Sequence, residues 1–242
     1  MKVMILGATG ATGRLVVNAL LQQGHTVIAQ VRNTETLNAL YPGHEDRLIQ
    51  LKGTVLSLGD GELSKVIHSV DGIICCLGHN LTMKGMYGAP HMLVTDSLQR
   101  IITLTDHNRS QPLKLVLMNS SGVVNHSQNE TVPFTQRMVL SLLRVLVPPH
   151  LDNERAALYL MQTCTDLPHI EWVTVRPDSL IDSDAVSDYE CHPSPIRSAI
   201  FNAGKVSRIN VANFMGQLMC EPVLWDQWKG KTPVMYNQSS MT

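Results

Sequence analysis

Three glycines spaced three residues apart stand between an apolar segment and a segment with helical spacing of its apolar residues. The apolar segment is Lys2–Leu6 and the helical segment is Arg14–Leu21. The residues between them are Gly7, Ala8, Thr9, Gly10, Ala11, Thr12 and Gly13. The first glycine permits a sharp turn, the second lets backbone N–H groups approach a phosphate, and the third lets the helix pack on the strand. Because the positive end of the helix faces this turn, the spacing predicts a site for the pyrophosphate of a dinucleotide.

The residue that follows the second predicted strand, Thr26–Val31, bears on the choice of dinucleotide. A unit that prefers NAD usually carries an acidic residue here to hold the ribose 2′-OH. This chain has Arg32 instead, and a guanidinium suits a 2′-phosphate. The alternative is that Arg32 is a solvated residue at a strand end. We predict that the cofactor is NADP, bound as NADPH, rather than NAD.

Further polar and glycine residues follow other predicted strands. Leu77 and Gly78 end the strand predicted at Gly72–Leu77, and Asn119 follows the strand predicted at Lys114–Met118. Open parallel sheets bind ligands at the carboxyl ends of their strands, so we expect these residues at the cofactor. The same edge receives the hydroxyls of Ser120 and Ser121, close to where a nicotinamide ring would lie. His79 and Asn80 either line the cofactor groove or belong to a plain surface loop.

Strands and helices alternate along the chain, which predicts parallel strand pairing. The remaining predicted strands are Leu48–Lys52, Ile170–Arg176 and Pro233–Asn237, and the remaining predicted helices are Gly61–His68, Met92–Asn108, Leu151–Thr163 and Asn210–Cys220. Negative charge is favourable near a helix start, which is where Asp152 is expected. We predict an α/β fold: a Rossmann-like doubly wound parallel sheet with helices on both faces, a small C-terminal substrate-side elaboration, and one domain over residues 1–242.

Two segments do not fit this alternation. Asp178–Pro195 has little hydrophobic periodicity and several turn residues, which predicts an irregular loop on the substrate side. Val132–Pro149 is rich in apolar residues and is either an amphipathic flap over the cofactor or a core helix.

Composition excludes several classes of partner. The net charge of −1 and the lack of a Lys/Arg cluster argue against nucleic acid. No apolar run reaches the length of a membrane span, and no cleavable signal fits before the first strand. The five cysteines form no CxxC pair, which favours reduced thiols in the cytoplasm, and the ten histidines lack metal-binding spacing. We expect a small-molecule substrate or acceptor and no metal; the oligomeric state stays open, with a homodimer as one candidate.

Four segments together resemble the atypical short-chain dehydrogenase/reductases: Gly7–Gly13, Val31–Asn33, Trp172–Pro177 and Val206–Ala212. The chain is similar to the NAD(P)-binding group that contains flavin reductase/biliverdin-IXβ reductase and the NmrA-like proteins. The resemblance covers nearly the whole chain in order. It implies a Rossmann core, NADP at the glycine turn with Arg32 on the 2′-phosphate, and Ser120 or Ser121 beside the nicotinamide.

The chain also departs from this family. Members that reduce carbonyls usually carry Tyr-x-x-x-Lys, but no tyrosine here is followed four residues later by lysine. The nearest feature is His150 with Glu154, which could deliver a proton near neutral pH; a helix-start histidine without a chemical role is the alternative that we favour. Thr54 stands where the family often has Asp, which leaves the adenine contact in question, and Asn210 is a second such exchange.

Three functions remain in competition. The leading hypothesis is an NADPH-dependent reductase that transfers a hydride to a flavin, a quinone or a small carbonyl compound. Transfer to a flavin- or quinone-like ring depends mainly on stacking and orientation, and so does not require the Tyr-Lys pair. The rival is a non-catalytic, NADP-binding sensor that regulates a partner, as some NmrA-like proteins do. A sugar-nucleotide epimerase is a weaker third choice.

Overall fold

The computed structural model describes residues 1–79, 87–125, 128, 130, 135, 138–139, 141–142, 144 and 147–238. Its strands are β1 (Lys2–Leu6), β2 (Thr26–Val31), β3 (Leu48–Lys52), β4 (Gly72–Cys75), β5 (Leu113–Met118), β6 (Ile170–Pro177), β7 (Ser179–Ile181), β8 (Tyr189–His192), β9 (Lys205–Ser207) and β10 (Val234–Asn237). Its helices are α1 (Gly13–Gln22), α2 (Glu35–Leu40), α3 (Asp60–Ser69), α5 (Leu93–Leu104), α7 (Pro148–Tyr159), α8 (Arg208–Cys220) and α9 (Pro222–Trp228). A π-helical turn, Leu160–Cys164, continues α7.

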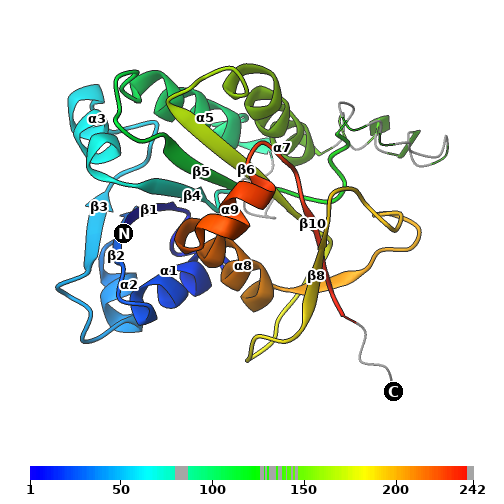
Figure 1. Cartoon of the computed structure of the whole chain (residues 1–242), viewed down its shortest axis with the longest axis horizontal. Coiled ribbons are helices and arrows are strands. Elements are labelled where there is room, and N and C mark those ends of the chain that lie inside the picture. The colour runs from blue at the N-terminus through cyan, green and yellow to red at the C-terminus, as the bar shows by residue number, and fades with distance from the viewer. Residues whose placement is uncertain are drawn as a thin grey trace.

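One central sheet carries the fold (Figure 1). Its eight strands follow the order β3-β2-β1-β4-β5-β6-β10-β8. Every pairing from β3 to β10 is parallel, and β8 is antiparallel to β10. The predicted Rossmann-like parallel sheet is therefore confirmed, and its order places the carboxyl ends of β1, β2 and β4 side by side.

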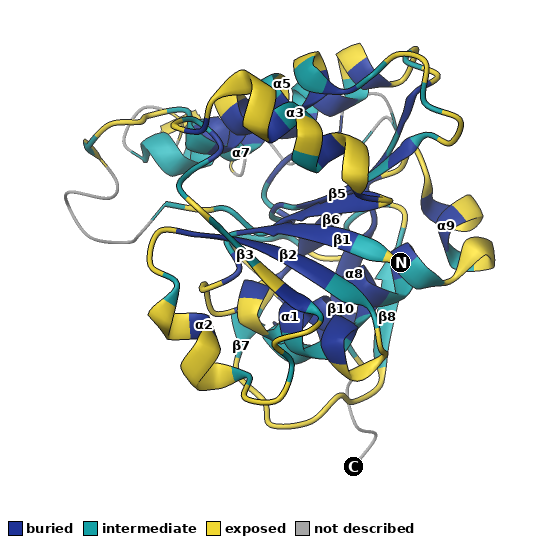
Figure 2. Cartoon of the chain, turned by 90° about the vertical axis from the view of Figure 1, so that its left-hand side faces the viewer, coloured by how far each residue is buried: buried dark blue, intermediate teal, exposed yellow. Residues whose placement is uncertain are grey.

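Helices cover both faces of this sheet, so its inner strands read as continuous apolar runs rather than alternating ones. One face packs against α1, α2, α8 and α9, and the other packs against α3, α5 and α7 (Figure 2). The side chains of Val3 and Ile5 belong to the first cluster, whereas Met4 and Leu6 belong to the second. All four are 0% exposed. This two-sided burial fixes β1, and with it the turn that follows it.

The C-terminal part differs from the prediction. The segment predicted as an irregular loop, Asp178–Pro195, contains β7 and β8. β8 is an edge strand of four half-buried residues, so it lacks the buried alternation that marks a strand in sequence. β7 pairs with β9 in a separate two-stranded sheet, which is the small C-terminal elaboration.

The sequence prediction also lacked two short helices, and it placed the ends of two other helices differently from the structure. No helix was predicted at α2 or α9, and α9 begins at Pro222, a residue that suits the first turn of a helix. Helix α7 begins at Pro148 rather than at Leu151, for the same reason. Helix α5 is shorter than predicted, because the backbone becomes extended at Thr105.

The hydrogen bonds of Asn210 explain why this chain has Asn at a position where the resembled family often has Asp. Its side chain is fully buried and its amide nitrogen donates to Asn237 Oδ1 at 2.8 Å and to Ser187 Oγ at 3.0 Å. Its oxygen accepts from the backbone N–H of Ser187 at 2.9 Å. Because an ionised aspartate has no donor, only the amide can make all three bonds.

Among the described residues, no helix has both the length and the apolar composition that a membrane span requires.

Candidate functional site

The glycine turn adopts the conformation that its spacing predicts. Gly7 ends β1 with φ of +73°, a value that favours glycine, and a Cβ on it would lie 2.6 Å from the carbonyl oxygen of Cys76. A Cβ on Gly13 would lie 2.1 Å from the carbonyl oxygen of Gly7, so this glycine lets α1 start against the strand. Gly10 is exposed, and its Cβ would meet only the Gly7 oxygen, at 3.2 Å.

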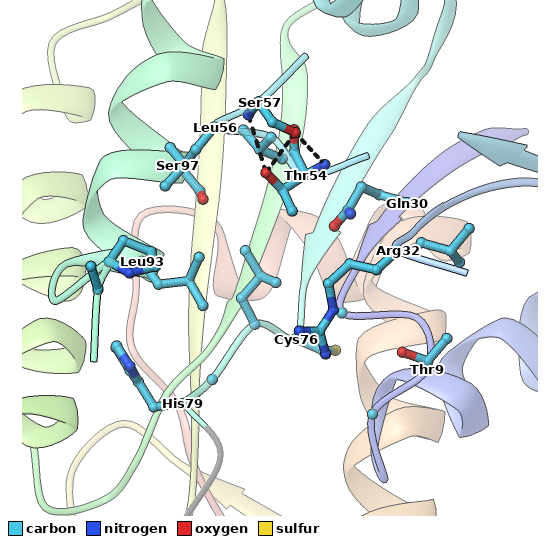
Figure 3. Close-up of a pocket in the computed structure, with 18 of the residues that line it drawn as sticks. Thr9, Gln30, Arg32, Thr54, Leu56, Ser57, Cys76, His79, Leu93 and Ser97 are labelled. Carbon is cyan, nitrogen blue, oxygen red and sulfur yellow. Dashed lines mark hydrogen bonds between the residues drawn. The ribbon is translucent and has the colours of Figure 1, made fainter. Parts of the chain in front are cut away.

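A groove of about 710 Å³ opens beside this turn, at the carboxyl ends of β1 to β4 (Figure 3). Of the predicted cofactor residues, the following line it: Gly7, Thr9, Gly10, Arg32, Thr54, Leu77 and Gly78. Ala8, Thr12 and Gly13 are buried in the packing of the turn, and Ala11 is exposed but lies outside the lining. The first N–H groups of a helix have no acceptor within it, so α1 offers donors to an anion at this place.

Arg32 lies at the end of β2, on the same side of the groove as Thr9 (Figure 3). Its side chain is exposed, and no described residue accepts a hydrogen bond from its guanidinium. A cation beside the glycine turn, with its donors uncommitted, fits a phosphate on the adenosine ribose.

The loop after β3 forms the far end of the groove. The hydroxyl of Thr54 donates to Ser57 Oγ at 2.9 Å and accepts from the Ser57 N–H at 3.1 Å. The amide of Gln30 donates to the carbonyl of Gly53 and so ties this loop to β2. Thr54 therefore lines the groove with its hydroxyl already paired within the loop.

Cys76, which lines the groove, and its neighbour Cys75 both have raised pKa values. Burial raises the pKa of Cys75 to about 12 and raises the pKa of Cys76, which lines the groove, even further from its ordinary value. A buried thiolate is disfavoured because the apolar surroundings solvate charge poorly. Neither thiol is ionised near neutral pH, so the groove offers no thiolate nucleophile.

His79 and Asp152 form a buried hydrogen-bonded pair at the edge of the groove. His79 Nε2 lies 2.9 Å from Asp152 Oδ2, and their side chains are 4% and 0% exposed. The same carboxylate accepts from the backbone N–H groups of Val94 and Thr95, at 2.8 and 2.9 Å, and from the Thr95 hydroxyl at 2.7 Å. Asp152 thus stabilises the N-terminus of α5. The predicted effect on its own helix start was wrong, because α7 begins at Pro148 and its first turn contains no acidic residue.

The two serines after β5 have different surroundings. Ser121 is buried, and its hydroxyl donates to Asp178 Oδ1 at 3.1 Å. Asp178 also accepts from the N–H of Gly204 at 2.9 Å, so Ser121 belongs to a network that joins β5 to the C-terminal elaboration. Ser120 is half-buried, and its Oγ accepts from the N–H of Gly122 at 3.2 Å.

Asn119 and His150 lie close to Ser120. Asn119 donates to the carbonyl of Asn153 in α7 at 2.8 Å. A Cβ on Gly122 would lie 3.5 Å from Ser120 Oγ and 3.8 Å from His150 Cε1, so the serine and the histidine share one neighbourhood. None of the three lines the groove described above; they lie on its β5 side.

His150 does not have the acidic partner that its spacing suggested. Glu154 is held by Arg144, whose Nε donates to it at 2.7 Å. Burial lowers the pKa of His150 and outweighs the opposing effect of the Glu154 charge. A lowered pKa leaves little imidazolium near neutral pH, so little of His150 is in the form that can donate a proton.

Two sequence predictions fall outside what the structure describes. Asn80 and half of the residues of Val132–Pro149 are not among the described residues. Sequence reasoning did not single out several of the described groove-lining residues, Ser97 of α5 among them, nor the partnership of His79 with Asp152. For Ser97 a signal existed, since it is a polar residue on the apolar face formed by Leu93, Leu98 and Ile101.

A family model described as NAD(P)H-binding matches residues 7–222. The chain belongs to this NAD(P)H-binding family. The match begins at the first glycine of the turn and spans the groove, and it confirms the resemblance to NAD(P)-binding reductases at the level of the family.

Curated relatives of the NAD(P)H-binding chain are distant. Isoflavone reductase of Pisum sativum is 27% identical over 154 residues, which cover 55% of this chain and 48% of that protein. The chain therefore spans about half the length of that relative. Probable pinoresinol-lariciresinol reductase 3 of Arabidopsis thaliana is 22% identical over 236 residues, 95% of this chain and 73% of that protein.

Solved structures share the fold. A Bacillus halodurans protein assigned to the NAD-dependent epimerase/dehydratases has a TM-score of 0.70 at 18% identity, covering 99% of this chain and 95% of its own. An anaerobillin reductase from Escherichia coli O157:H7 has a TM-score of 0.68 at 14% identity, with complete coverage of both chains. A Streptococcus pneumoniae protein assigned as an NADH-flavin reductase has a TM-score of 0.67 at 14% identity, covering 98% of this chain and 100% of its own.

Proposed function

We propose that this NAD(P)H-binding protein is an NADPH-dependent reductase of the atypical short-chain dehydrogenase type. The observation that carries the proposal is the groove in which an uncommitted guanidinium, Arg32, stands beside the glycine turn. NADPH, when bound, supplies a hydride from its nicotinamide ring. The chain supplies the phosphate cradle at Gly7 to Gly13, a cation for the 2′-phosphate, and hydroxyl groups on the β5 side.

The acceptor we propose is a flavin, a quinone-like ring or a small carbonyl compound. On the β5 side, His150 carries little imidazolium near neutral pH because its pKa is lowered, and the Ser121 hydroxyl is bound to Asp178. An acceptor that takes a hydride into a conjugated ring needs orientation more than a protein acid, and its proton can come from solvent. The names of two structural relatives, an anaerobillin reductase and an NADH-flavin reductase, support acceptors of this class.

The five cysteines are free thiols, which supports a reducing compartment, and we propose the cytoplasm.

Replacing Arg32 with alanine will weaken NADPH binding about tenfold or more and leave NADH binding nearly unchanged. The loss corresponds to one charge-assisted hydrogen bond, about 1.5–3 kcal/mol. Isothermal titration calorimetry of both cofactors measures it. Arg155→Ala, which removes an exposed charge of α7 outside the groove, is the matched control. Equal affinities of the native protein for NADPH and NADH would refute the NADP preference.

We expect alanine substitutions of Ser120 and Ser121 to have different effects. Ser120→Ala will lower turnover about 10–1000-fold with little change in NADPH affinity, as expected when a positioned hydroxyl is lost. Ser121→Ala will instead lower the free energy of unfolding, because Asp178 loses a buried donor. Steady-state kinetics and urea unfolding of both variants distinguish the roles. A normal turnover in Ser120→Ala would remove that residue from the catalytic site.

A non-catalytic NADP sensor predicts a different pattern. Such a sensor binds NADPH through the same cradle but shows no turnover with any acceptor. Mixing the protein with NADPH and a panel of flavins, quinones and aldehydes therefore decides between the reductase and the sensor.

A further inference from the structure

Ser97 lines the groove with a buried hydroxyl for which phosphate binding at the glycine turn gives no role. Its side chain is 0% exposed, and its hydroxyl has no hydrogen-bond partner among the described residues. Figure 3 shows the hydroxyl directed from α5 toward the groove, on the side opposite Gln30 and Arg32. A buried hydroxyl without a partner is unfavourable, so its presence at a ligand groove points to a partner on the ligand.

The contacts of α5 assign this hydroxyl to one end of the groove. Arg100 lies one turn after Ser97 and donates to the carbonyl of Val55 at 2.5 Å and to the carbonyl of Leu58. These bonds hold the loop after β3 against α5. Since Arg32 and this loop lie on the β2–β3 side of the glycine turn, Ser97 lies at the adenosine end. Ser120, which follows β5, lies on the opposite side of the turn.

The adenosine end lacks the carboxylate that the family often places after the third strand. Thr54 occupies that position, and its hydroxyl is paired with Ser57. The neighbouring lining residues Val55, Leu56 and Leu93 are apolar. Ser97 therefore carries the polar group best placed at this end to read the edge of a base.

We propose that Ser97 is the adenine-specifying residue of this groove. Its hydroxyl accepts a hydrogen bond from the 6-amino group of the adenine, while Leu56 and Leu93 pack against the ring. The proposal rests on the proposed binding of NADP and names the residue that selects its base.

Ser97→Ala has two opposite effects under this proposal. It removes an unpaired buried group, so the thermal midpoint of the ligand-free protein stays the same or rises. It also removes the base contact, so the affinity for 2′,5′-ADP and for NADPH falls about fivefold to tenfold. Thr103→Ala, which removes an exposed hydroxyl from the same helix, leaves both affinities unchanged.

The decisive experiment compares 2′,5′-ADP with its analogue that lacks the 6-amino group, by calorimetry on the native protein and on Ser97→Ala. The native protein should prefer 2′,5′-ADP about fivefold to tenfold, and the variant should bind both ligands equally. A preference that persists in the variant would overturn the role of Ser97 while leaving NADP binding in place. If the native protein binds neither ligand nor NADPH, the proposed function falls together with this inference.

Discussion

Gly10→Val will abolish dinucleotide binding while the protein keeps its fold. Gly10 is exposed at the groove, and a Cβ there meets only the Gly7 carbonyl oxygen, at 3.2 Å, so the two further methyl groups extend into the space for the pyrophosphate. The expected loss is at least about 100-fold in NADPH affinity, or more than about 2.7 kcal/mol. Calorimetry measures the affinity, and circular dichroism checks the fold.

A suitable control for this variant is Gly61→Val, because a Cβ at Gly61 meets nothing within 4 Å and the residue lies outside the groove lining. Gly13→Val would not be informative, since its Cβ would lie 2.1 Å from a backbone oxygen and the fold itself would have to shift. If Gly10→Val is folded and still binds NADPH normally, the phosphate cradle lies elsewhere.

Asp152→Ala will lower the free energy of unfolding by about 2–6 kcal/mol, because two buried backbone N–H groups lose their acceptor at a cost of about 1–3 kcal/mol each. The substitution removes the acceptor of two backbone N–H groups of α5, those of Val94 and Thr95. It also removes the carboxylate bonded to the His79 ring and to the Thr95 hydroxyl, although that hydroxyl keeps its bond to the backbone carbonyl of residue 152. Because these groups hold the start of α5 beside the groove, NADPH affinity will fall as well. Urea unfolding measures the stability.

Asp166→Ala, at an exposed carboxylate beyond the π-helical turn, is the matched control and should change stability by less than about 0.5 kcal/mol. Asp152→Asn retains one oxygen acceptor and should lose less stability than the alanine variant. A loss below about 1 kcal/mol in Asp152→Ala would contradict the role assigned to this carboxylate.

The parts of the fold that the sequence predicts well are those with strong local signals. The buried strands β1 and β2 are apolar runs bounded by glycine or polar residues, and the glycine turn between β1 and α1 has a fixed spacing. The strand β8 has no such signal. Its four residues are half-buried. It forms a strand only because β10, which lies more than forty residues later in the chain, pairs with it and places Asn237 opposite Tyr189.

The residues of the candidate site also differ in how well the sequence predicts their positions. Gly7, Gly10 and Arg32 line the groove as their sequence positions predict, because a turn after a strand and the end of a neighbouring strand share one sheet edge. The pairing of His79 with Asp152 joins residues 73 positions apart, and local spacing carries no trace of it.

The serines show a second limit of sequence reasoning. Their position after β5 was predictable, but which hydroxyl turns toward Asp178 depends on the path of the chain after β6. Only the folded chain distinguishes Ser121 from Ser120.

The most direct test of the account is to mix the native protein with NADPH and a panel of flavins, quinones and aldehydes and to follow the loss of nicotinamide absorbance. We predict that at least one flavin or quinone-like acceptor oxidises NADPH faster than in the protein-free control, and that Arg32→Ala slows this reaction at subsaturating NADPH. The account is contradicted if NADPH binds in the micromolar range typical of such cofactors and yet no acceptor in the panel oxidises it above the control rate.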